Sequence, residues 1–525
     1  MQRRHVLSGL AASVAAPAVV AAQGARVLRF VPSTDLSITD PIFGTSFTTR
    51  NHALLVFDTL YGVDEQGVAQ PQMAEGHVVE DGGLTWRIRL RPGLRFHDGE
   101  RVLARDCVAS IRRWGQRDTF GQALMAATNE IAAGSDSEIV WRLRKPFPML
   151  PDALGKMLTH VCVMMPERLA RADAYTQVRE MVGSGPFRFL ADEHQLGHLA
   201  AYARFDGYVP RPSGTPSAAA GPKLVHFDRV EWRILPDPST AAAALAKGEI
   251  DWWLNPTGDQ QAALRRDRNL KVEVIDPLGS VGMIRFNFLH PPYDNPAVRR
   301  AALAAISQSD FMSAMIGTDR SLWRLPCGFF TPGSPMASDA GMEAIKDPPD
   351  LPRAREMLKA SGYAGEKLAL LATGTIELIS NQAQVAADAF AKIGFNVELQ
   401  LYDTAAADQK IRNKGPVAQG GWSAYSNTTT GMAASNPAAH GFIRGHGEQA
   451  IWGWPALPRL EELRNAWFEA PTLAAQQDIC RRIQLHCFET VPFVPTGVFL
   501  SPVAYRANLI DIRRGIAQFY GVRRA

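Results

Sequence analysis

The residue types that carry catalysis occur in this chain without the spacing that catalysis needs. The sequence contains no G-x-S-x-G, G-x-x-x-x-G-K-[ST], H-E-x-x-H or G-x-G-x-x-G motif. Ser184 lies between two glycines like a nucleophile, but Pro186 follows at once, which favours a structural turn. His97 and Asp98 are adjacent at a turn and are poorly placed to act on one target. We therefore expect no catalytic residue, no cofactor and no enzymatic activity.

Metal-binding side chains are equally scattered. The 12 histidines and five cysteines show no metal-ligand spacing, although His440 and His446 are candidates for nickel or haem. Cys480 and Cys487 lie seven residues apart on a predicted helix, about 10 Å, too far for a disulfide. We expect no bound metal, at least one free cysteine because the count is odd, and cysteines that mostly act as buried small hydrophobic residues, with the disulfide pairing left open.

Alternating apolar residues predict the strands that would position such groups. Leu84–Leu90 alternates, Pro92-Gly93 turns the chain and Leu94–His97 follows, which together predict a β-hairpin. Similar runs occupy 139–143 and 230–234. The stretch Val209–Lys223 is rich in Pro, Gly, Ser and Ala and predicts an exposed loop.

Amphipathic segments predict the helices. In residues 102–114, Cys107, Ile111 and Trp114 share one face, and Arg112 and Arg113 another. Further helices are predicted over 296–306 with Asn295 as cap, 352–361, 382–393, 457–469 and 473–490. Gly394 ends one of them before an alternating strand over 395–401, which is an α/β unit.

Length and charge narrow the class of protein. A chain of 525 residues is too long for one core, so two or three domains are expected. The formal charge of +4 is small and the charged residues are interspersed, so we expect no nucleic-acid partner.

The first 22 residues have the pattern of an export signal. Arg3 and Arg4 precede an apolar run that ends in small residues at Ala22, where cleavage is predicted. The double arginine also fits a weak twin-arginine signal, so both export routes stay open. A buried N-terminal helix is the structural alternative.

Several segments resemble the extracytoplasmic solute-binding proteins of family 5, the oligopeptide, dipeptide and nickel class that feeds ABC importers. The hairpin F-H-D-G is one, and the others follow in the family's order. They are Asp58–Tyr61, Gly67–Glu75, Gly183–Phe187, Ile234–Asp251, Phe286-Asn287, Pro291–Asp294, Leu358–Tyr363 and Gly421-Trp422.

The resemblance implies an α/β, two-lobed periplasmic-binding-protein fold of type II-like topology, with an extra subdomain and a ligand cleft between the lobes. Lobe one would take 26–66, 184–281 and 490–525, the extra subdomain 67–183, and lobe two 282–489. The implied function is a monomeric periplasmic protein that captures a small organic solute by hinge closure. Its partner would be an inner-membrane ABC permease with its ATPase.

Candidate ligand contacts lie in segments that match the family's cleft. A Ser/Thr loop offers hydroxyl groups, and aromatic side chains offer flat apolar area. An arginine in one of these segments fits a carboxylate. The candidates are Thr45, Ser46, Thr48, Trp323, Arg324, Trp422, Tyr425, Asn427 and Trp452.

One departure from the family bears on the solute. Peptide-binding members carry an aspartate after the late Gly-Trp segment, which pairs with the ligand's α-amine. Residues 422–441 contain no carboxylate, so a buried amine would lack a partner there. A neutral or anionic solute is favoured over a peptide held by its amine. A secreted twin-arginine-exported enzyme and a ligand-sensing or chaperone-like protein are the alternative functions.

Overall fold

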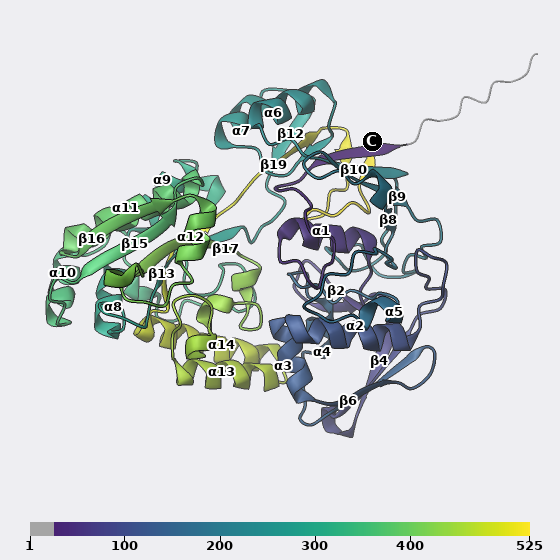
Figure 1. The fold of residues 1–525 in the computed structure, drawn as a ribbon, viewed down its shortest axis with the longest axis horizontal. Helices are drawn as coiled ribbons and strands as arrows, with labels where there is room; N and C mark the ends of the chain where they lie inside the picture. Colours follow the sequence, from purple (N-terminus) through teal and green to yellow (C-terminus); the bar gives the residue numbers. More distant parts are fainter. Residues whose placement is uncertain (1–25) are drawn as a thin grey trace, which may run out of the picture.

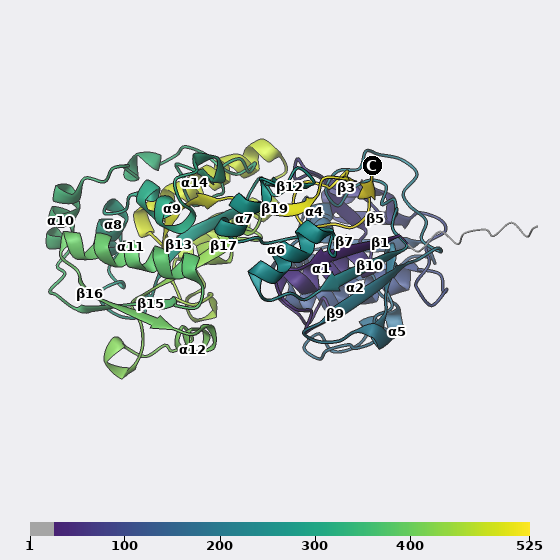
Figure 2. The same cartoon turned by 90° about the horizontal axis from the view of Figure 1, so that it is seen from above.

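The computed structural model describes residues 26–525 and has two lobes side by side (Figures 1 and 2). The predicted export signal lies outside the described residues. Among the described helices, none combines the length and apolar character needed to cross a membrane.

The first lobe is built on a seven-stranded mixed sheet. β1 runs parallel to both of its neighbours, β10 and β11. Helix α1 (Phe47–Val56) packs on one face, and α6 (Pro238–Lys247) and α7 (Gly258–Leu264) on the other. From edge to edge the strands are β12 (Leu270–Glu273), β19 (Val503–Arg506), β11 (Trp252–Trp253), β1 (Val27–Val31), β10 (Arg229–Arg233), β9 (Leu199–Arg204) and β8 (Phe187–Phe189).

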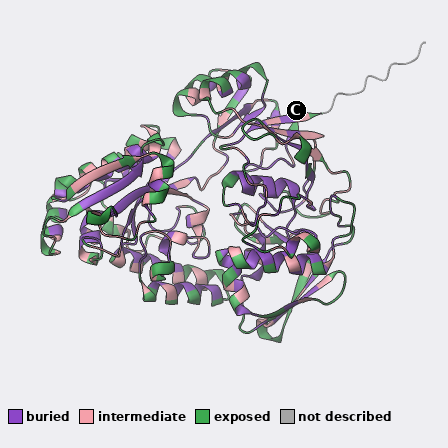
Figure 3. Ribbon diagram, in the orientation of Figure 1, coloured by how far each residue is buried: buried purple, intermediate pink, exposed green. Residues whose placement is uncertain are grey.

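The second lobe is built on a six-stranded sheet. Helices α9 and α11 cover one face of this sheet, and α8 and α14 lie on its other side. The strands between these helices have long buried stretches (Figure 3). From edge to edge the strands are β14 (Trp323–Arg324), β18 (Phe493–Phe499), β13 (Ser280–Phe286), β17 (Ala424–Thr430), β15 (Lys367–Thr373) and β16 (Asn396–Tyr402). The helices of this lobe are α8 (Pro296–Ala304), α9 (Gln308–Ile316), α10 (Leu351–Ala360), α11 (Glu377–Ile393), α12 (Thr404–Lys410), α13 (Pro458–Glu469) and α14 (Leu473–Thr490).

A four-stranded antiparallel sheet with its own helices stands beside the first lobe. Its strands, in sheet order, are β4 (Ala74–Glu80), β5 (Thr85–Leu90), β7 (Glu138–Leu143) and β6 (Thr128–Ala133). Its helices are α2 (Ala104–Arg117), α3 (Thr119–Ala127), α4 (Leu150–Gly155) and α5 (Glu167–Ala170). Two strand pairs complete the fold, β2 (Tyr61–Val63) with β3 (Ala69–Pro71) and β20 (Leu509–Ile510) with β21 (Arg523–Arg524).

The chain crosses between the lobes through residues 274–279 and 500–502. The division expected from the sequence placed the return to lobe one at residue 490. β18 instead pairs with β13 and β14 in the second sheet, so the return falls about ten residues later. Glycine makes the close approach at this hinge possible. Gly279 has φ +59°, and a Cβ there would lie 2.2 Å from the Phe499 carbonyl oxygen.

Two local predictions were wrong. Leu94–His97 forms no strand, and β5 pairs instead with β4 and β7. The loop Val209–Lys223 is exposed only in its first part; its end is buried.

Candidate functional site

The hinge brings together the start of α1 from the first lobe with the short strand β14 and the end of β17 from the second. Arg324 of β14 pairs with Val498 of β18, just before the second crossing. The Gly431 amide, which follows β17, donates to the Gly279 carbonyl of the first crossing at 2.6 Å. Side chains at these three places are therefore those that a solute held at the hinge would meet first.

The predicted Ser/Thr loop leads into α1 and serves mainly to cap it. Ser46 is the N-cap, and its hydroxyl accepts a hydrogen bond from the Thr49 amide at 3.0 Å. Thr48 is buried and bonds to Thr34 at 2.7 Å. Thr45 is exposed. Two of the three hydroxyls thus have structural partners, and ligand contact by this loop stays a prediction.

The residues next to this loop were missed by the sequence analysis. Phe47, the first residue of α1, is 47% exposed, and the Arg50 guanidinium lies 5.0 Å from its ring centroid. Arg50 itself is 7% exposed, and burial lowers its pKa to about 10. Among the described groups, Asp276 in the first crossing is the charged group that opposes this shift.

Asp276 connects the two lobes electrostatically. Burial raises the pKa of this carboxyl group, and the Leu278 and Gly279 amides act to lower it. The charges of Arg50 from lobe one and Arg324 from lobe two also lower it. Two cations from opposite lobes thus flank one half-buried anion at the hinge.

Of the two candidate ligand contacts on β14, one lies in the core and the other is partly accessible. Trp323 is buried, and the Arg320 guanidinium lies 4.0 Å from its ring centroid. Arg324 is half-buried and lies at the hinge end of the sheet. Of this pair, the arginine is the residue placed to meet a solute.

The predicted aromatic residues of the late Gly-Trp segment belong to the core of lobe two. Trp422 is 1% exposed, and its indole N–H donates to the Ile411 carbonyl at 3.1 Å. Tyr425 is buried against it, edge to face at 5.1 Å, and burial raises the tyrosine pKa to about 12. Asn427, further along β17, is half-buried. Trp422 lies at the start of the strand, about 25 Å from its hinge end at roughly 3.3 Å per residue.

Trp452 covers the same face of the sheet. It is half-buried, with the Arg412 guanidinium 5.3 Å from its ring centroid, and its carbonyl accepts from the buried Arg285 at 3.0 Å. The contacts of Trp422, Tyr425 and Trp452 are those of core and surface packing. Their contact with a solute stays a prediction.

The candidate metal ligands have structural roles. The His440 ring is buried and bonds to the Phe329 carbonyl at 2.9 Å through Nε2. His446 Nε2 lies 2.8 Å from a Glu461 oxygen. Within residues 26–525 no group of three or more His, Cys, Asp or Glu side chains is arranged to hold a metal. The five cysteines are free and buried.

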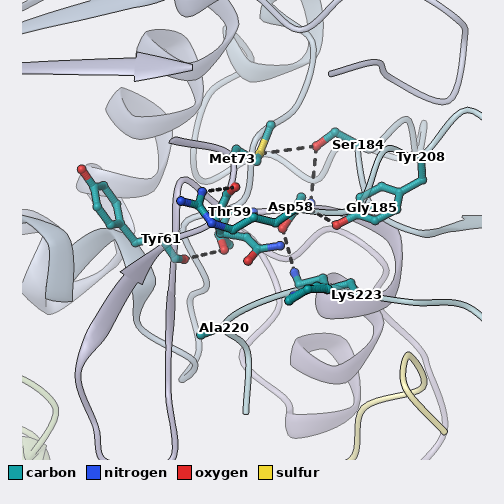
Figure 4. Close-up of polar contacts among 12 residues, drawn as sticks. Asp58, Thr59, Tyr61, Met73, Ser184, Gly185, Tyr208, Ala220 and Lys223 are labelled. Atoms are coloured by element: carbon teal, nitrogen blue, oxygen red, sulfur yellow. Dashed lines mark hydrogen bonds and ion pairs between the residues drawn. The ribbon is translucent and has the colours of Figure 1, made fainter. Parts of the chain in front are cut away.

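The serine and histidine that resemble catalytic residues hold turns together. The Ser184 hydroxyl accepts a hydrogen bond from the Asp58 backbone amide at 3.4 Å (Figure 4). His97 bonds to the Gly185 carbonyl at 3.0 Å, and burial lowers its pKa to about 4.

An ion pair in lobe one explains why the end of the 209–223 loop is buried. Lys223 Nζ lies 2.7 Å from Asp58 Oδ1, and both side chains are fully buried (Figure 4). The Tyr208 hydroxyl donates to Asp58 Oδ2 at 2.9 Å. Asp58 raises the pKa of Lys223 against the opposing effect of burial. This cluster attaches the loop to the strand pair β2–β3 and lies outside the hinge.

Two lobes joined by two crossing segments form the hinged architecture that periplasmic binding proteins use to close on a solute. The profile described as "Bacterial extracellular solute-binding proteins, family 5 Middle" matches residues 68–440. The chain belongs to this family and is the solute-binding component of an ABC importer.

Relatives and solved structures agree with this assignment. The chain is 34% identical over 513 residues, 96% of each chain, to a Sinorhizobium fredii protein named "Probable peptide ABC transporter periplasmic-binding protein y4tO". It is 26% identical to the glutathione-binding protein GsiB of Pectobacterium atrosepticum, covering 81% of this chain and 79% of that one. The solved structure of AgaA from A. tumefaciens R10 with agropinic acid has the same fold, with a TM-score of 0.78, 19% identity, and coverage of 95% and 99%.

Proposed function

We propose that this protein works in the periplasm, where it encloses a small organic solute between its lobes and delivers it to an inner-membrane permease and its ATPase. The observation that supports this proposal is the hinge, in which two segments connect the lobes. A solute that contacts both lobes adds interactions only in the closed state, so binding shifts the equilibrium towards closure. The relatives named for ABC importers support the partner.

The solute is acidic or neutral rather than a peptide held by its amine. Residues 422–441 carry no carboxylate, and Asp276 at the hinge is already flanked by two arginines. A cationic amine would therefore meet net positive charge. The candidate contacts at this end are Thr45, Arg324 and Asn427.

Mass spectrometry of the solute released on heating tests this function. The protein is exported from cells grown in rich medium, heated and then refolded without solute. Adding the identified solute back should raise the melting temperature and reduce the radius of gyration in solution scattering. The proposal would be contradicted if no solute were released and if a strain lacking this protein took up organic solutes from the medium as well as the wild type does.

We also propose that Met1–Ala22 is the export signal. The mature protein should then begin near Gln23, which N-terminal sequencing of the exported protein checks.

A further inference from the structure

Arg50 is exceptional among the buried arginines of the described chain. Six other arginines have 8% or less of their surface exposed, and each donates to at least one backbone carbonyl. They are Arg91, Arg113, Arg285, Arg299, Arg464 and Arg513. Arg50 donates from Nε and Nη2 to one oxygen only, the amide oxygen of its neighbour Asn51, at 3.2 and 3.0 Å.

This arrangement is costly for the protein alone. A guanidinium has five N–H donors, and burial without a charged or multiple acceptor leaves much of its desolvation cost uncompensated. No described carboxylate lies within 4.0 Å of Arg50. The Nη1 group has no hydrogen bond and is not fully enclosed. The Nη1 group of Arg50 is therefore available to a hydrogen-bond acceptor from outside the chain.

The surroundings of Arg50 suit a ligand. Phe47 packs beside the guanidinium and is itself 47% exposed, so part of its ring is accessible next to Arg50. Both residues lie in the first turn of α1, where backbone N–H groups and the helix dipole also favour an anion. A guanidinium matches the geometry of a carboxylate, and an aromatic ring beside it offers apolar contact to the rest of an organic solute.

Arg324 supplies the matching charge from the other lobe. It is half-buried on the two-residue strand β14, opposite Val498 of β18, and Asp276 stands within electrostatic reach of both arginines. Two guanidinium groups and one carboxylate leave a net charge of about +1. Asp276 therefore offsets only one of these two charges.

We propose that Arg50 and Arg324 together bind a carboxylate of the solute, so that the protein imports an acidic organic compound held at the hinge. The inference rests on the proposed function and names its solute class. Because the two arginines belong to different lobes, a carboxylate between them also draws the lobes together. Arg50 and Arg324 are then specificity-determining residues, and the free α-amine of a peptide is dispensable.

Calorimetric titration with matched probes tests this assignment. The probes are glutathione, trialanine and agropinic acid, each compared with its carboxyl-blocked methyl ester or amide, together with N-acetyl-trialanine. At least one free acid should bind 10-fold or more tightly than its blocked form. Where trialanine binds, N-acetyl-trialanine should bind with an affinity that differs from it by less than threefold. Arg50→Gln and Arg324→Gln should each weaken binding of the acid by roughly 10- to 100-fold.

Two controls separate this role from a structural one. Arg320→Gln removes a nearby guanidinium that stacks on Trp323, and it should leave affinity unchanged. Arg50→Gln should melt, without solute, at the wild-type temperature or above it, because a buried cation has been removed. A lower melting temperature with unchanged affinity would assign Arg50 a structural role and overturn the proposal.

Other outcomes also overturn it. Equal binding of acids and blocked forms, no binding of any free acid, or release of an uncharged solute from the exported protein would each reject an acidic solute. Release of an uncharged solute would leave the proposed transport function intact. If the exported protein released no solute and its deletion did not impair uptake, that transport function would be rejected as well.

Discussion

Four histidines are buried deeply enough that the folded protein keeps them neutral. Burial lowers the pKa of His52 and His440 to about 3, and of His97 and His160 to about 4. In the unfolded chain a histidine titrates near 6.5. Below that pH the unfolded state binds protons that the folded state does not, so acid favours unfolding.

Stability should therefore fall as the pH drops from about 6.5 towards 4. Each buried histidine contributes about 1.4 kcal/mol per pH unit to that loss. In His440→Gln the amide can still donate to the Phe329 carbonyl, and the slope of unfolding free energy against pH should decrease by about that amount. Urea unfolding at pH 7.5, 6.0 and 5.0 measures it. His198→Gln, at an exposed turn, should leave the slope unchanged; equal slopes for all three proteins would refute the assignment.

The Asp58–Lys223 pair makes a second prediction at this scale. Lys223→Met should destabilise the protein by roughly 3–5 kcal/mol, because it leaves a buried carboxylate without its cation. Adding Asp58→Asn should recover part of the loss, since the neutral amide needs no counter-charge. Urea unfolding of the two single variants and the double variant gives the coupling energy. Additive losses would mean that the two groups do not stabilise each other.

Single residues could be assigned from sequence only where their neighbours in the chain decide their role. Asn295 before Pro296 and the glycine at 394 were predicted as caps and act as such. Arg50 could not be recognised, because Asp276, the carboxylate that influences its pKa, is 226 positions away in sequence and its lack of a carbonyl acceptor is a tertiary property. The one available signal was its place directly after the predicted Ser/Thr loop.

At the scale of elements, α3 and α13 make a second contact between the two halves of the molecule (Figure 1). Phe120 of α3 and Phe147 pack against Phe468 of α13 at ring distances of 5.6 and 5.8 Å. Lys145 pairs with Glu469, and the Thr119 hydroxyl donates to the Ala438 carbonyl at 3.2 Å. We call this group, far from the hinge in sequence, the α3–α13 contact.

Weakening the α3–α13 contact should favour separated lobes. Phe468→Ala removes an aromatic side chain worth roughly 1–3 kcal/mol of contact, so the solute-free protein should open more often and bind its solute about 5- to 100-fold more weakly. Spin labels at Gln122→Cys and Glu462→Cys, both exposed positions, report the distance while the five native cysteines stay buried. Leu473→Ala, an exposed position on α14, is the control. An unchanged distance distribution in Phe468→Ala would contradict this role.

Elements were predicted well where their pattern is local and poorly where pairing is distant. The helices ending at 469 and 490 and the strand after 394 follow directly from periodicity and caps. The expected hairpin at Leu84–Gly99 failed, because β5 finds its partners in β4 and in β7, about 50 residues later. The alternation itself, with Trp86, Ile88 and Leu90 buried, was correct.

At the scale of the whole molecule, the hinge and the α3–α13 contact lie at opposite ends of the surface where the lobes face each other. The family resemblance predicted the two-lobed fold, and the comparisons confirm it. The positions of aromatic candidates were less predictable, because a tryptophan in a strand suits a core and a binding surface equally. Trp422 faces the core, and the hinge carries charge instead.

The two crossings also determine the order in which the chain can fold. Residues 280–499 form the second lobe as one uninterrupted segment, whereas β19 lies inside the first sheet, between β12 and β11. That sheet cannot close until residues 503–506 have emerged, more than 200 residues after β12. The second sheet is completed only slightly earlier, when β18 emerges at 493–499. The strands of the first lobe are therefore made first and wait longest, and until β19 arrives the unpaired edges of β11 and β12 are accessible to chaperones and proteases.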